Sequence, residues 1–318
     1  MERLQNILVG VDLHQGDRVV SDNFGEVTLA AIEQACELAR FHQAQLTLCA
    51  VLEISEQAVH LIELDLQNIR QTVEDKAALS LQKLAALVQE KGIAARTIVR
   101  FGRSWEELTR EVIEGQFDVV VVGTREHGMA RRLLFGSTAQ KLIRFCPSPV
   151  WIVKPGEVRE IREVLVASDL SESAQAAVQT AVRVAGALNA RLFVVHSLEF
   201  PFETYLRTAG VTEDEVQKYR ETLHQEATSK LQAQLALTDS RTLQQGVQME
   251  IVEGTPDVAL PEYVDRHGVD VVVIGTQGRS GLSGVLLGNT AERLLPQLHA
   301  SLVAVKPAGY VSPYERTE

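Results

Sequence analysis

The sequence predicts an α/β protein made of two copies of one parallel-sheet unit, and two observations support this fold class. Short apolar runs rich in valine and isoleucine, such as residues 119–122 and 271–274, alternate with longer amphipathic segments. Runs of β-branched residues without charge are typical of strands buried on both faces of a parallel sheet. The second half of the chain then repeats the pattern of the first half. A length of 318 residues fits two domains.

The expected elements of the first half follow one another regularly. Apolar runs predict strands at residues 6–11, 46–51, 95–100, 119–122 and 150–153. Apolar residues three or four apart predict helices at residues 28–41, 59–89, 105–114 and 138–143, the second being one long helix or a pair. Strands that alternate with helices in this way form parallel βαβ units with right-handed crossovers.

The same order recurs in the second half. Strands are expected at residues 163–167, 192–196, 248–252, 271–275 and 302–305, with a helix ending at Ala185 and helices at residues 213–237 and 257–266. Gly123, Gly136 and Val153-Lys154-Pro155 recur 152 residues later as Gly275, Gly288 and Val305-Lys306-Pro307. This is an internal duplication. It predicts one domain over residues 1–155 and a second over residues 160–309, followed by a tail at residues 310–318.

Composition limits the kinds of partner and the compartment. A net charge of −11 offers no basic excess for binding nucleic acid or an anionic membrane surface. The three cysteines, Cys36, Cys49 and Cys146, form no CxxC pair, which argues against a disulfide framework and fits a reducing cytosol. The sequence shows no run of eighteen apolar residues and no signal-like segment. The expected location is therefore the cytoplasm.

A glycine-rich loop follows the fourth expected strand of the second half. Gly275 ends the strand, Gly278 and Gly288 follow, and Asn289 and Thr290 then begin the next expected helix. Glycines allow backbone N–H groups to approach a ligand closely, and the start of a helix attracts anions. One hypothesis is a phosphate-binding cradle. By spacing alone the loop is equally well explained as a turn-rich surface loop.

The arrangement of the whole chain resembles the universal stress protein family. The resemblance rests on a five-strand unit, an Asp after its first strand, and a G-x2-G-x9-G-[polar] loop after its fourth strand. The segments Cys146-Pro147-Ser148-Pro149-Val150-Trp151 and Gly288-Asn289-Thr290-Ala291-Glu292 are similar to those of tandem, E-type bacterial members. The resemblance covers almost the whole chain. It implies two Rossmann-like domains, each a five-stranded parallel sheet of order 3-2-1-4-5 with helices on both faces, in a family of which some members bind ATP.

Strand order gives a physical reason for a site in the second domain. In the order 3-2-1-4-5, the first and fourth strands are neighbours and the chain leaves them in opposite directions, which creates a ligand-binding crevice at their carboxyl ends. By similarity, Ala167, Asp169 and Ser197 lie around the adenine, and Ile274 and Gly275 pass beneath the ribose. The phosphates are then held by Gly278, Gly288, Asn289 and Thr290, to which Arg279 adds positive charge. The family usually has Ser where Asn289 stands, which weakens the expected phosphate contact.

The corresponding site of the first domain departs from this pattern. Asp12, Gly123, Gly136, Ser137 and Thr138 are retained, but Glu126 places a carboxylate where the second glycine belongs, and a carboxylate repels phosphate. One interpretation is a degenerate cradle with a structural role. The other is that Arg125, His127, Arg131 and Arg132 bind a different anionic ligand. A longer loop after Asp12, at residues 13–29, is expected to lie over the opening of this first-domain site, which it could occlude.

Simpler roles compete for several of these residues. Asp12 and Asp169 follow strands, where Asp most often caps a turn or a helix. We favour ligand contact for Asp169 only. His196 lies within a strand and is expected to be a core histidine with a satisfied hydrogen bond. The eight histidines show no HxH or HExxH spacing, so no structural metal is predicted, and Mg²⁺ is expected only with ATP.

The sequence therefore predicts a cytoplasmic stress-response protein that binds an adenine nucleotide, ATP, in its second domain, for regulation and not for catalysis. Arg279 is the only ionisable residue between Gly275 and Thr290, so ATP hydrolysis should at most be slow. The alternatives are a ligand-independent scaffold protein and a weak ATPase or transferase on a related fold. Pairing of residues 150–153 with residues 302–305 is expected to form an intramolecular pseudo-dimer. The sequence leaves open whether it forms a homodimer and which protein is its partner.

Overall fold

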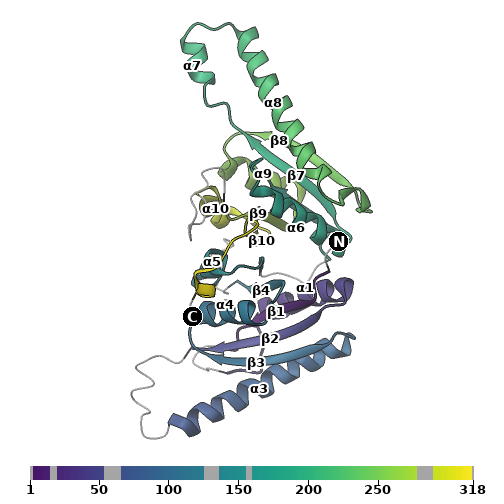
Figure 1. Ribbon diagram of the computed structural model, residues 1–318, viewed down its shortest axis with the longest axis vertical. Helices are drawn as coiled ribbons and strands as arrows, with labels where there is room; N and C mark the ends of the chain where they lie inside the picture. The colour runs from purple at the N-terminus through teal and green to yellow at the C-terminus, as the bar shows by residue number, and fades with distance from the viewer. Residues whose placement is uncertain are drawn as a thin grey trace. The chain divides into compact units, whose positions relative to one another are not determined.

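The structure is a computed structural model that describes residues 3–14, 20–53, 66–124, 136–154, 160–277 and 289–316. In it, the chain divides into two compact units (Figure 1). The first unit comprises residues 2–160 together with residues 310–318, and the second unit comprises residues 161–309.

A parallel five-stranded sheet forms the centre of the first unit. Its strands are β1 (Asn6–Val11), β2 (Gln45–Leu52), β3 (Ala95–Phe101), β4 (Val119–Gly123) and β5 (Val150–Val153), in the order β3-β2-β1-β4-β5. Its helices are α1 (Glu26–His42), α3 (Leu66–Glu90), α4 (Ser104–Glu114) and α5 (Ser137–Phe145). A Cβ atom at Gly10 would point toward Leu108 of α4, and a Cβ atom at Gly123 would point toward Val27 of α1. Because Gly10 pairs with Val122, next to Gly123, the two helices cover opposite faces of the sheet.

The second unit repeats this arrangement. Its strands are β6 (Glu163–Ala167), β7 (Arg191–Leu198), β8 (Val247–Glu253), β9 (Val271–Gly275) and β10 (Ser301–Val305), and their order is β8-β7-β6-β9-β10. Its helices are α6 (Ala174–Ala187), α7 (Glu203–Thr208), α8 (Glu213–Ala236), α9 (Pro256–His267) and α10 (Asn289–Leu294). In both units the first strand lies between the second and the fourth. The expected fold class and the strand order 3-2-1-4-5 are confirmed.

Buried aliphatic side chains explain why the strands were predictable. The first four residues of β4 and of β9 are all buried, and each strand ends at a half-buried glycine. Valine and isoleucine fill both faces of these strands, as expected for a parallel sheet covered by helices. Among the described residues, no helix combines the length and the apolar character needed to cross a membrane.

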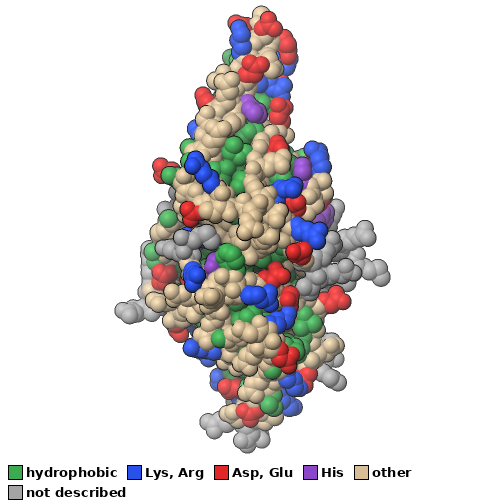
Figure 2. All heavy atoms as spheres, turned by 90° about the vertical axis from the view of Figure 1, so that its right-hand side faces the viewer, with side chains coloured by type: hydrophobic (Ala, Val, Ile, Leu, Met, Phe, Trp, Pro, Cys, Tyr) green, Lys and Arg blue, Asp and Glu red, His purple; other side chains and the backbone are tan. Residues whose placement is uncertain are grey.

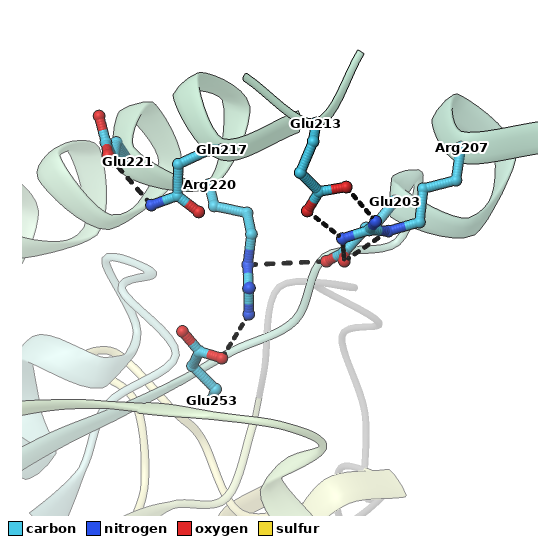
Figure 3. Close-up of polar contacts among 7 residues, drawn as sticks. All are labelled: Glu203, Arg207, Glu213, Gln217, Arg220, Glu221 and Glu253. Atoms are coloured by element: carbon cyan, nitrogen blue, oxygen red, sulfur yellow. Dashed lines mark hydrogen bonds and ion pairs between the residues drawn. The ribbon is translucent and has the colours of Figure 1, made fainter. Parts of the chain in front are cut away.

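Helices α7 and α8 form an arm that extends from the sheet of the second unit (Figure 1). The sequence predicts α8 but not α7, which has six residues and buries none of them. Two ion pairs fix α7 to α8: Arg207 of α7 pairs with Glu213 of α8, and Glu203 of α7 lies 3.6 Å from Arg220 of α8 (Figure 3). Arg220 of α8 pairs with Glu253 at 2.5 Å, which attaches the arm to the end of β8. Figure 2 shows acidic and basic side chains interspersed over the end of this arm.

The C-terminal segment packs on the first unit. In η3 (Pro313–Arg316), the ring of Tyr314 lies edge-on to Trp105 of α4 and Phe145 of α5, with centroid distances of 5.5 and 5.7 Å. The hydroxyl of Ser312 donates to the carbonyl of Phe145 at 2.8 Å, and that of Tyr310 donates to the carbonyl of Arg144 at 3.0 Å. The segment expected as a tail thus packs against α4 and α5 of the first unit.

Candidate functional site

Strands β6 and β9 bring the two halves of the candidate site together. They are parallel neighbours, and Ala167 pairs with Ile274 at their carboxyl ends. After Ala167 the chain continues into α6, and after Gly275 it continues toward α10. Two loops therefore leave adjacent strands at the same edge of the sheet, which is the topological switch point at which open α/β sheets bind ligands.

The loop after β6 is a tight turn closed by Asp169. Its Oδ1 accepts the backbone N–H of Ser171 at 3.0 Å and also the hydroxyl of Ser171. In the first unit, Asp12 uses Oδ1 in the same way to accept the N–H of His14 at 2.9 Å. Both aspartates thus serve the turn that follows a strand, which is the simpler of the two roles expected for them. Contact of Asp169 with a ligand stays a prediction.

The two loops touch each other. The hydroxyl of Ser173, beside the start of α6, donates to the backbone carbonyl of Gln277 at 3.3 Å. Gln277 is the second residue after Gly275, so the first part of the glycine-rich loop lies against the turn that contains Asp169. This contact was not predicted, because a single serine before a helix is most simply explained as a cap.

Ser197 lies at the end of the neighbouring strand β7. Its hydroxyl donates to the carbonyl of Gly254 at 2.5 Å, which ties the end of β7 to the turn after β8. His196, just before it, is buried, and its Nδ1 lies 2.8 Å from the carbonyl oxygen of Ser168. His196 therefore has the hydrogen bond expected of a core histidine.

A buried threonine follows the last glycine of the fourth strand in both units. Thr276 is 1% exposed and Thr124 is 8% exposed. The backbone N–H of each continues the sheet, bonding to Val305 and to Val153 respectively. Neither hydroxyl has a hydrogen-bond partner among the residues that the structure describes. Such a group is costly unless water or a ligand satisfies it. The signal was present in the sequence, since the two threonines are 152 residues apart like the glycines before them.

The glycines that end β4 and β9 have different surroundings. A Cβ atom at Gly123 would overlap Cγ1 of Val27 and lie 3.4 Å from the carbonyl oxygen of Val27. At Gly275 the nearest described atom would be the carbonyl oxygen of Gln277, at an ordinary contact distance of 3.7 Å. Helix α1 therefore closes the space beside Gly123, whereas the corresponding space beside Gly275 is open as far as the described residues show.

The long loop after β1 is anchored to helix α3. The carboxylate of Asp22 accepts the hydroxyl of Ser80 at 2.6 Å and pairs with Lys83, both on α3. The hydrogen bonds from Lys83 and Ser80 lower the pKa of Asp22. Asp22 thus ties this loop to the long helix of the first unit, while residues 15–19 of the same loop lie outside the described part.

Several predicted site residues cannot be placed. Gly278, Arg279 and Gly288 of the second unit lie outside the described residues, as do Arg125, Glu126, His127, Arg131 and Arg132 of the first. Asn289 and Thr290 begin α10, and Ser137 and Thr138 begin α5 directly after Gly136, as expected for residues at a helix start. Within the described ranges, no group of histidine, cysteine or carboxylate side chains is arranged to hold a metal ion.

The chain is similar throughout to known proteins of one family. A model described as the universal stress protein family matches residues 4–154 and again residues 160–306. Universal stress protein E of Salmonella typhi is 27% identical over 99% of this chain and 98% of its own length. Universal stress protein E of Photorhabdus laumondii is 24% identical over 98% of each chain.

Solved structures support the same fold. A functionally unknown protein of Pseudomonas aeruginosa PAO1 superposes with a TM-score of 0.65 at 22% identity, covering 96% of this chain and 93% of its own. A universal stress protein of Archaeoglobus fulgidus DSM 4304 gives a TM-score of 0.65 at 18% identity, covering 95% and 98%. At these identities the likeness concerns the fold.

Proposed function

Because the chain belongs to the universal stress protein family, a family of stress-response proteins, we propose that its second unit binds an adenine nucleotide, ATP, as a regulatory ligand. The observation that carries the proposal is the meeting of two loops at the carboxyl ends of β6 and β9, where Ser173 contacts Gln277. At such a switch point the ligand lies beyond the sheet, between the two loops.

The described residues fit a nucleotide in three respects. Ala167, Asp169 and Ser197 are half-buried at the ends of β6 and β7, where they can line a pocket for the base. The hydroxyl of Thr276 is buried and has no partner among the described residues, so it can bond a ligand or the water around it. None of the described residues blocks the approach of a ribose to the backbone at Gly275.

The glycine-rich loop supplies the proposed phosphate site. In this assignment, Ile274 and Gly275 lie beneath the ribose, and the phosphates are bound by Gly278, Arg279, Gly288, Asn289 and Thr290. The backbone N–H groups at the start of α10 favour an anion through the helix dipole. A bound Mg²⁺ would be held mainly by phosphate and water. Arg279 is the only ionisable side chain in the loop, and it neutralises charge but cannot act as a general base at neutral pH. This composition favours binding over hydrolysis.

We propose that the first unit does not bind the same ligand. Val27 fills the space beside Gly123, and Glu126 would set a carboxylate against phosphate. The hydroxyl of Thr124, which like that of Thr276 has no partner among the described residues, supports a common origin of the two positions. The expected stoichiometry is therefore one nucleotide per chain.

Calorimetric titration with ATP and Mg²⁺ tests this function. The unaltered chain should bind one ATP, and Gly278→Glu, which copies Glu126 of the first unit, should weaken binding roughly tenfold or more through charge repulsion. Gln232→Glu is the matched control, because it adds the same charge at an exposed position of α8. Equal affinity in Gly278→Glu would reject the site. Absence of binding by the unaltered chain would reject the nucleotide and favour a ligand-independent scaffold.

A further inference from the structure

We propose that Gln234 of α8 is a positioning residue that holds the turn around Asp169 and thereby sets the base selectivity of the nucleotide site. The proposal rests on the proposed function of the second unit. It assigns a role to a residue that lies 65 positions from Asp169 in the sequence and on a different element.

Gln234 bonds to both sides of the turn. Its Oε1 accepts the hydroxyl of Ser168 at 2.7 Å, and its Nε2 donates to the carbonyl of Ser171 at 2.9 Å. Its own backbone carbonyl accepts Nε2 of Gln175 on α6 at 3.1 Å. Asp169 therefore lies in a segment whose two ends are fixed by one amide group, which belongs to a residue that is only 8% exposed.

The turn needs this support because its backbone conformation is unfavourable. Leu170 has a backbone φ of 63°, in the left-handed region that residues other than glycine, asparagine and aspartate rarely adopt. The N–H of Leu170 donates to the hydroxyl oxygen of Ser168 at 3.1 Å. The same hydroxyl donates its proton to Gln234, so the amide orients the group that holds Leu170.

A packing role alone does not explain a glutamine at this position. Neighbouring residues on the buried face of α8 are apolar, namely Ala227, Leu231 and Leu235. Leucine at position 234 would continue this face without the cost of burying an amide. In the first unit, the long helix also binds the loop after the first strand through side chains, but there Ser80 and Lys83 hold Asp22. Each unit thus ties this loop to its long helix in its own way.

Base selectivity follows from the chemistry of a fixed carboxylate. An ionised carboxylate only accepts hydrogen bonds. Adenine presents an exocyclic amino donor where guanine presents a carbonyl acceptor. A carboxylate held beside this edge accepts from adenine and repels guanine, and it loses this discrimination when the turn moves. The proposed phosphate-binding loop follows β9, whereas the turn with Asp169 follows β6. Movement of the turn should therefore affect the contacts to the triphosphate less than the contacts to the base.

Gln234→Leu tests the proposal, with Gln232→Leu on the exposed face of α8 as its matched control. Without nucleotide, hydrogen exchange measured by mass spectrometry should speed up about tenfold in peptides that contain residues 168–173. If the turn then holds Asp169 in the binding position only about one tenth of the time, ATP binding weakens about tenfold. GTP binding changes less, so the ratio of ATP affinity to GTP affinity falls. Gln232→Leu should match the unaltered chain in all three measurements.

Unchanged exchange in the turn, or an unchanged affinity ratio despite faster exchange, would overturn the proposal. If Gln234→Leu does not fold, Ser168→Ala decides, because it removes only the hydroxyl that connects Gln234 to Leu170 and should act in the same direction. If the unaltered chain binds no ATP, the proposed function and the selectivity are both wrong. Faster exchange in that case would leave Gln234 as an anchor of the turn alone.

Discussion

Gly123 and Gly275 hold the same place in the two units but have different neighbours. In the first unit, the missing side chain leaves room for Val27 of α1. In the second unit, the described residues do not fill the space where a side chain at Gly275 would lie. The same residue type is thus closely packed in one copy and has no close contact among the described residues in the other. The sequence repeat explains why both are glycine, and only the packing shows that their surroundings differ.

This contrast predicts different responses to alanine. Gly123→Ala should destabilise the chain by about 1–3 kcal/mol, because its methyl group overlaps the stiff side chain of Val27. Gly275→Ala should have a much smaller effect on unfolding in urea, but it should weaken ATP binding if the ribose approaches this residue. The double variant Val27→Ala/Gly123→Ala should lose less stability than the two single variants together. Equal cost of the two glycine substitutions would contradict this account.

At the scale of single elements, α7 and the C-terminal segment depend on side-chain contacts with neighbouring elements. Helix α7 buries no residue and is stabilised by the ion pairs of Arg207 with Glu203 and Glu213. Isolated short helices are unstable in water, so propensity does not predict one here. The C-terminal segment is ordered by an aromatic cluster in which Tyr314 contacts Trp105 and Phe145.

Tyr314→Ala should therefore destabilise the first unit by about 1–3 kcal/mol through loss of aromatic contacts. Tryptophan fluorescence can follow this loss, because both tryptophans, Trp105 and Trp151, lie in the first unit. We expect a lower unfolding midpoint and a changed emission from Trp105. Tyr205→Ala is the control, since Tyr205 is 71% exposed on α7 and its removal should leave the midpoint unchanged. An unaltered midpoint in Tyr314→Ala would show that the contact contributes no stability.

At the scale of the whole molecule, the two halves of the chain form units with the same strand order and different side chains in their interiors. All three cysteines lie buried in the first unit. Burial raises the pKa of Cys36 from about 9 to about 11 and that of Cys49 to about 12. Their thiols should therefore stay protonated and unreactive at neutral pH in the folded chain.

These shifts predict a loss of stability at alkaline pH. Below pH 9 the thiols are protonated in both states and their contribution is constant. Between pH 9 and the raised pKa values the unfolded chain ionises first, so stability falls by about 1.4 kcal/mol per pH unit for each thiol. Buried Tyr263, whose pKa is raised to about 12, acts in the same direction. The double variant Cys36→Ala/Cys49→Ala should show a shallower decline in urea unfolding between pH 9 and pH 11. An identical slope would contradict the assignment to these thiols.

The sequence by itself determined the strands, their alternation with helices and the duplication, because β-branched runs such as those of β4 and β9 must be buried wherever the sheet lies. Together with the family resemblance, it also placed Asp169 and Gly275 at one edge of the sheet. Only the tertiary structure decided that Val27 closes the space beside Gly123, that Thr276 is buried without a partner among the described residues, and that Gln234 holds the turn at Asp169. Local patterns encode burial and periodicity, whereas these contacts join residues that are far apart in the chain and whose meeting depends on packing.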